Sequence, residues 1–100
     1  MKTITITNEY KDTLRKFVEW FQEEFEPTDR ENQIVLKRLM AKLDRTEGTT
    51  ESIKINETEI WFLRNYLQSA WQDTSCTVDG NALHELFDYI VEKDNGQTNS

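Results

Sequence analysis

Hydrophobic residues recur at helical spacing in four stretches of the chain, and two further stretches alternate hydrophobic and polar residues. The most hydrophobic window, residues 60–71, reads IWFLRNYLQSAW and carries two of the three tryptophans. Its hydrophobic side chains cover most of the circumference of a helix, which is typical of a central helix or of an oligomer contact. We therefore expect a helix, capped by Asn56 and ending near Gln72, to lie at the centre of the fold.

Three more amphipathic helices are predicted, and each has a recognisable boundary. Pro27 ends the first, Thr28 and Glu31 form a capping box that opens the second, and Asp79 can cap the last. We expect these helices to span about residues 8–25, 28–45 and 80–93. Their hydrophobic faces are formed by Tyr10, Leu14, Phe17, Val18, Phe21 and Phe25, by Val35, Leu36, Leu39, Met40 and Leu43, and by Leu83, Leu86, Phe87 and Ile90.

The two alternating stretches predict short β-strands. Residues 3–7 read TITIT, and residues 53–55 read IKI, so each places two isoleucines on one face. The fold class predicted is therefore mainly α, a four-helix single domain with two short β-strands. We expect the domain to cover residues 1–93, followed by a flexible polar tail over residues 94–100.

The two halves of the chain resemble each other. ITITNEYKDTLRKFVEW, starting at Ile4, aligns with IKINETEIWFLRNYLQS, starting at Ile53, and a second amphipathic helix follows each segment. One interpretation is a strand–helix–helix repeat with units over residues 3–45 and 52–93. The other is that any strand leading into a capped amphipathic helix shows this pattern. If the repeat is real, we expect the two strands to pair beside the helices.

The net charge of the chain limits the classes of molecule that it is expected to bind. The chain carries 19 acidic and 12 basic residues, for a formal net charge of −7. Direct binding to nucleic acid is not expected, because that requires a basic surface. The charge instead favours attraction to a basic protein surface. The basic side chains of the second helix, Lys37, Arg38, Lys42 and Arg45, are predicted to pair with the acidic residues that end the first helix.

Cysteine usage and hydropathy indicate a cytoplasmic protein. Cys76 is the single cysteine, so no disulfide can form within the chain. The first ten residues lack the apolar core of a signal peptide, and no run approaches the ~20 apolar residues of a membrane span. No membrane partner is therefore expected.

No pattern in the sequence indicates catalysis. His84 and Asp88 share a helical face and lie near Cys76, but a zinc site requires three or four ligands. A thiol nucleophile would need its base beside it, and nothing in the spacing selects that arrangement. A phosphate-binding glycine-rich loop is absent. We expect no enzyme activity, no metal and no cofactor.

Aromatic and acidic residues provide the candidate site. Trp20 and Trp61 both project away from the hydrophobic faces assigned above, and tryptophan is enriched at interface hot spots. The alternative is that each covers a second side of the core. The candidate partner-binding residues are Trp20, Trp61, Glu19, Glu23, Glu24 and Glu26. They predict a non-enzymatic protein-interaction module, an acidic inhibitor or regulator that binds a larger protein.

Two alternative functions remain open. Carboxylates are dense around the turn between the first two helices and could imitate nucleic acid phosphates on a basic protein groove. The excess hydrophobic surface of the central helix could instead form a homodimer, as in a structural protein. In size and composition the chain resembles the small accessory proteins of phages and mobile elements, which implies an inhibitory or regulatory role.

Overall fold

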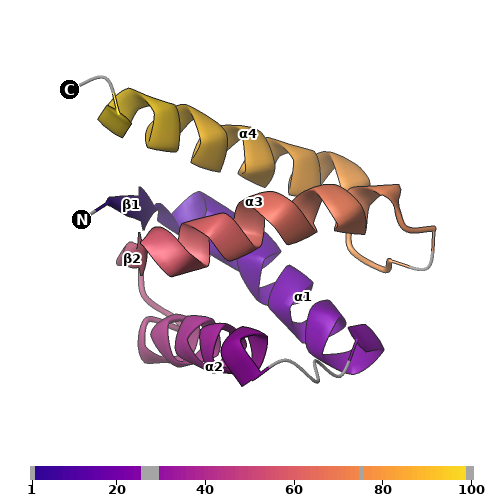
Figure 1. Cartoon of the computed structure of the whole chain (residues 1–100). Helices are drawn as coiled ribbons and strands as arrows, with labels where there is room; N and C mark the ends of the chain where they lie inside the picture. Colours follow the sequence, from indigo (N-terminus) through magenta and orange to yellow (C-terminus); the bar gives the residue numbers. More distant parts are fainter. Residues whose placement is uncertain (1, 26–29, 75, 99–100) are drawn as a thin grey trace.

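The computed structural model describes residues 2–25, 30–74 and 76–98. Within these residues the chain forms β1 (Thr3–Ile6), α1 (Asn8–Phe25), α2 (Arg30–Arg45), β2 (Ile53–Asn56), α3 (Glu57–Gln72) and α4 (Gly80–Thr98). In Figure 1, α3 lies between α4 on one side and α2 on the other, with the sheet at its N-terminal end. The predicted fold class, four helices with a two-stranded sheet, is confirmed.

Local signals set the start of α3. The Asn56 side chain accepts a hydrogen bond from the Glu59 amide at 2.9 Å, and Glu59 Oε1 accepts one from the Asn56 amide at 2.8 Å. This reciprocal pair is the capping box that the sequence predicts. The corresponding box at Thr28, like Pro27, lies outside the described residues.

α4 is longer than predicted, because it continues to Thr98 rather than ending near Lys93. Asp94, assigned by sequence to a flexible tail, is only 5% exposed and pairs with Arg64 of α3. The tertiary contact supports a helical turn that the polar sequence of residues 94–98 does not predict. None of the described helices is long and apolar enough to cross a bilayer.

The register of the sheet favours the repeat interpretation. β1 and β2 are antiparallel, with Ile4 opposite Ile55 and Ile6 opposite Ile53. A two-fold axis through the facing pair Thr5 and Lys54 would therefore exchange Ile4 with Ile53 and Ile6 with Ile55, which is the correspondence in the sequence. α1 begins as far after Ile4 in the sequence as α3 begins after Ile53. α2 then follows α1 as α4 follows α3.

The core lies between the sheet and the four helices. The four strand isoleucines are buried together with α3 side chains that face in several directions, namely Ile60, Phe62, Leu63, Leu67 and Ala70. The ring of Phe21 in α1 meets Phe62 and Tyr66 of α3 edge-on, at 5.3 and 5.1 Å. These contacts place α3 at the centre of the fold, as predicted.

Helix side chains bond to the backbone of both strands. The carbonyl oxygen of Thr5 in β1 accepts a hydrogen bond of 2.6 Å from the Tyr89 hydroxyl of α4. The carbonyl oxygen of Lys54 in β2 accepts one of 2.8 Å from Lys42 Nζ of α2. Thr5 and Lys54 face each other across the sheet and are counterparts in the repeat, and the two donors come from the corresponding helices α4 and α2.

Tyr10 and Tyr89 stack between α1 and α4, with ring centroids 4.4 Å apart. Burial and the nearby carboxylates raise the pKa of the Tyr10 hydroxyl above its ordinary value; these carboxylates are Glu9, Glu85 and Glu92. The folded protein therefore holds this proton more tightly than the unfolded chain does. The resulting stabilisation is present below the unfolded pKa of about 10 and is lost as the pH rises through the folded pKa.

We therefore expect the free energy of unfolding to fall as the pH is raised above about 10. Tyr10→Phe removes the titrating group and should make this decline shallower. Urea unfolding of both proteins between pH 8 and pH 11 measures the two slopes. Equal slopes would show that Tyr10 does not contribute to alkaline unfolding.

Candidate functional site

The two candidate tryptophans have different environments. Trp61 is 60% exposed, whereas Trp20 is 5% exposed and its ring lies 6.5 Å from Phe17 in the core. The expectation that Trp20 is an exposed anchor is therefore corrected. Trp20 borders small hollows with Ala70 of α3 and with Val78 of the α3–α4 connector, so a second side of α1 is covered.

The candidate carboxylates do not surround Trp61. Glu19, Glu23 and Glu24 are exposed on the C-terminal half of α1, and Glu26 lies outside the described residues. Glu19 and Glu23 border a hollow with residues 77–78, which follow the C-terminal end of α3. Trp61 lies near the opposite end of α3, about 15 Å away along the helix axis. The five described candidates therefore do not form one continuous surface.

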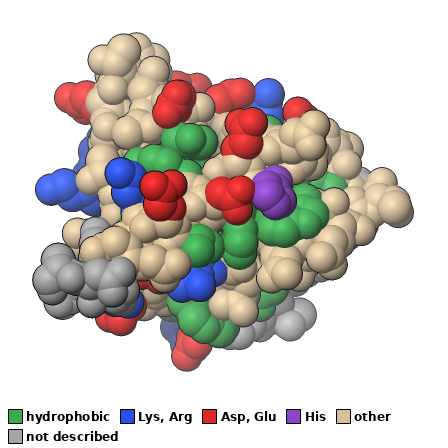
Figure 2. All heavy atoms as spheres, turned by 90° about the horizontal axis from the view of Figure 1, so that it is seen from above, with side chains coloured by type: hydrophobic (Ala, Val, Ile, Leu, Met, Phe, Trp, Pro, Cys, Tyr) green, Lys and Arg blue, Asp and Glu red, His purple; other side chains and the backbone are tan. Residues whose placement is uncertain are grey.

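Trp61 instead lies in an open groove of about 410 Å³ between α3, α4 and the N-terminal residues. We call this the α3–α4 groove, and its lining consists of Lys2, Glu57, Ile60, Trp61, Arg64, Asn65, Gln68, Phe87 and Asp94. Figure 2 shows the face above α4, where acidic side chains and the histidine border hydrophobic side chains. Among the described residues, Trp61 and Ile34 are the two large hydrophobic side chains classed as exposed.

A buried carboxylate, paired with two partly exposed cations, lies in the α3–α4 groove. Asp94 Oδ2 lies 2.6 Å from Arg64 Nη1, and Asp94 Oδ1 lies 3.4 Å from Lys2 Nζ. The two cations compensate a carboxylate that is almost excluded from solvent. This arrangement joins α3, α4 and the chain segment before β1.

The Trp61 side chain itself has no partner among the described residues. Its backbone carbonyl accepts a hydrogen bond of 2.7 Å from the Asn65 side chain, but no ring stacking or cation–π contact involves its indole. Glu57, one helical turn before it, is exposed and forms no ion pair with a described residue. An indole without a ring or cation contact and a carboxylate without an ion pair to a described residue thus lie side by side on α3.

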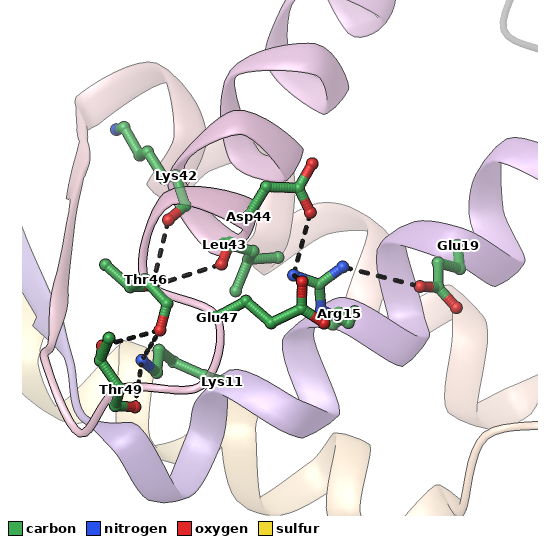
Figure 3. A network of polar contacts seen from close by, with 9 residues as sticks. All are labelled: Lys11, Arg15, Glu19, Lys42, Leu43, Asp44, Thr46, Glu47 and Thr49. Atoms are coloured by element: carbon green, nitrogen blue, oxygen red, sulfur yellow. Dashed lines mark hydrogen bonds and ion pairs between the residues drawn. The ribbon is translucent and has the colours of Figure 1, made fainter.

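A related groove of about 350 Å³ lies between α1 and the loop that follows α2. There a loop of the chain itself forms one wall of the groove (Figure 3). Lys11 Nζ donates hydrogen bonds of 3.2 Å to the carbonyls of Thr46 and Thr49, and Gly48 turns the loop with φ of 77°. Arg15, the counterpart of Arg64 in the repeat, pairs with Asp44 at 3.0 Å.

The comparisons of this chain with protein-family models, curated proteins and solved structures gave no match. The function must therefore be argued from the groove itself.

His84 and Cys76 belong to no metal-binding cluster among the described residues. No group of three or more His, Cys, Asp or Glu side chains is placed to hold a metal among them. His84 is exposed, with Nδ1 3.2 Å from Asp88 Oδ2 and its ring 5.0 Å from that of Trp71. Cys76 is a half-buried free thiol.

Sequence reasoning identified Trp61 but missed the rest of its groove. Glu57 precedes Trp61 by one helical turn, and Asn65 and Gln68 follow it at helical spacing. This polar row beside a tryptophan was an available signal. Lys2 and Asp94 carried no such signal, because both lie at the ends of the chain and meet only in the folded structure.

Proposed function

We propose that this protein is a non-enzymatic protein-interaction module, an inhibitor or regulator that binds a larger protein at the α3–α4 groove. The observation that carries the proposal is the 60% exposure of Trp61 at the α3–α4 groove. Covering the exposed part of an indole contributes about 3 kcal/mol before the costs of association. Tryptophan is enriched among the side chains that contribute most to binding at protein interfaces.

Charge supports the choice of partner class. A net charge of −7 favours encounter with a basic protein surface and disfavours direct contact with nucleic acid. In this proposal the exposed carboxylates on α1, Glu19, Glu23 and Glu24, contribute to the long-range attraction, and Trp61 supplies the anchor. A cytoplasmic setting belongs to the same proposal.

The test is capture of a partner on the immobilised protein from a lysate of the organism that encodes it. Three baits are compared: the natural chain, Trp61→Ala and Ile34→Ala. Ile34 is the matched control, because it is the other large hydrophobic side chain classed as exposed and lies on α2. We expect Trp61→Ala to weaken retention at least about thirtyfold, equivalent to about 2 kcal/mol, and Ile34→Ala to leave it unchanged.

Washing at low and at high salt separates the alternatives. An interface anchored by an aromatic side chain should survive high salt, whereas a nucleic acid mimic that binds through carboxylates alone should release its partner. Equal retention by the natural chain and Trp61→Ala would contradict the proposal. A homodimeric structural protein would instead show twice the chain mass in solution, and Trp61→Ala would return it to the monomer.

A further inference from the structure

We propose that the α3–α4 groove recognises a polypeptide segment carrying an arginine or lysine, whose cation lies on the Trp61 ring and pairs with Glu57. This inference rests on the proposed function and specifies the chemistry of the partner. It is argued from the two unpartnered groups in the groove and from the way the chain fills the equivalent places in its other half.

The first argument is the pairing of an indole with a carboxylate. Glu57 and Trp61 are four residues apart on α3, and both border the groove. Neither side chain has an ion pair or a ring contact among the described residues. A cation over the face of tryptophan is attracted by the ring, and a nearby carboxylate adds a charge-assisted hydrogen bond.

The second argument concerns the other charges in the groove. Lys2 and Arg64 are also present, but both pair with the buried Asp94. An acidic ligand would have to compete with Asp94 for these cations in a protein of net charge −7. Among the charged residues that line the groove, Glu57 is therefore the one without an ion pair to a described residue, which favours a basic ligand.

The third argument comes from the repeat. The counterpart of Trp61 in the first half is Asp12, and Lys16 from the next turn of α1 pairs with it at 3.1 Å. The counterpart of Lys16 is Asn65, which has no charge. The first half thus supplies its own cation at this position, whereas the second half leaves the position to a cation from outside.

The repeat also indicates that the ligand is a polypeptide. Residues 46–49 of this chain lie against α1 in the first groove, held by the Lys11 bonds to two backbone carbonyls. In the second half α4 continues as a helix and no loop of the described chain covers the groove. A segment of a partner protein can therefore lie against α3 as residues 46–49 lie against α1.

The test is an NMR titration of the full chain with short peptides. The probe is a nine-residue glycine–serine peptide with three arginines, and the matched peptides carry glutamine or glutamate instead. The three tryptophan indole signals are assigned with single Trp→Phe variants. We expect the arginine peptide to shift the Trp61 signal with a dissociation constant of about 1 mM or below, and the other peptides to leave it unchanged.

Matched variants test whether the Glu57 carboxylate binds the arginine peptide. Glu57→Gln should weaken the binding of the arginine peptide about three- to tenfold, while Glu51→Gln, with the same change of net charge at an exposed site in the loop after α2, should change it less than twofold. Asn65→Lys, which copies the Lys16 arrangement, should also weaken it. Equal effects of Glu57→Gln and Glu51→Gln would overturn the inference, because binding would then follow net charge alone.

Two outcomes distinguish this inference from the proposed function. Partner capture that depends on Trp61, together with no response to the arginine peptide, would reject the cationic ligand and leave the interaction module standing. A response to the glutamate peptide in place of the arginine peptide would also reject the inference, since it would assign recognition to Arg64 and Lys2.

Discussion

Replacing Trp20 by alanine is expected to lower the free energy of unfolding by about 3–5 kcal/mol. The Trp20 side chain is buried between α1, α3 and the connector, and its removal would leave a cavity beside Phe17. Trp61→Ala should change stability by no more than about 0.5 kcal/mol, because that side chain is largely in solvent. Urea unfolding followed by circular dichroism measures both values.

The pair of tryptophans also separates stability from binding. Trp20→Ala should reduce partner capture only to the extent that the domain is unfolded, whereas Trp61→Ala should reduce capture in a fully folded protein. Similar stability losses in the two variants would contradict the placement of Trp61 at the surface. Total stabilities of domains are about 5–15 kcal/mol, so the Trp20 substitution removes a large share.

Lys42→Met is expected to destabilise the protein by about 3 kcal/mol, although replacing a lysine at a protein surface usually has little effect on stability. Lys42 Nζ lies 2.5 Å from Glu59 Oε1 and donates a second bond to the Lys54 carbonyl. Glu59 is 1% exposed, so methionine would leave a buried carboxylate without its cation. The Lys54 carbonyl would lose a donor at the same time.

A second substitution tests this explanation. Glu59→Gln in the Lys42→Met background removes the uncompensated charge and should restore most of the lost stability. Lys37→Met is the control, because Lys37 lies on the same helix and is exposed. If Lys37→Met and Lys42→Met have equal effects on the urea midpoint, the Glu59 contact does not stabilise the fold.

The arrangement of helices and strands follows from local sequence. The capping box of Asn56 and Glu59 depends on residues three apart, and the strand isoleucines face the core because of their alternation. The hydrophobic window of residues 60–71 predicted the central helix for the same reason. These signals are local and do not depend on how the rest of the chain folds.

Contacts between distant residues were less predictable. The basic residues of α2 were expected to pair with acids at the end of α1, but Lys42 instead contacts Glu59 and the carbonyl of Lys54, because β2 and α3 pack beside α2. Trp20 was expected at the surface, and the end of α3 with the following connector covers it. Periodicity describes one face of a helix and does not reveal which neighbours cover the others.

The candidate site was predicted only in part for a related reason. Trp61 was identified because it points away from the hydrophobic face of its own helix, which is a local property. The groove around it requires the alignment of α3 with α4 and of Lys2 with Asp94. The grouping of Trp61 with the α1 carboxylates was an assumption of proximity that the packing of the helices does not support.

The side chains that bond to the two strands also limit how copies of this protein can associate. A two-stranded sheet has no interior strand, and such exposed edges are where chains exchange strands or begin to form fibrils. Here Tyr89 bonds to the Thr5 carbonyl of β1 and Lys42 bonds to the Lys54 carbonyl of β2, so an incoming strand would have to displace one of these contacts at whichever edge it approached. Growth by strand addition is thus opposed at each edge of the sheet.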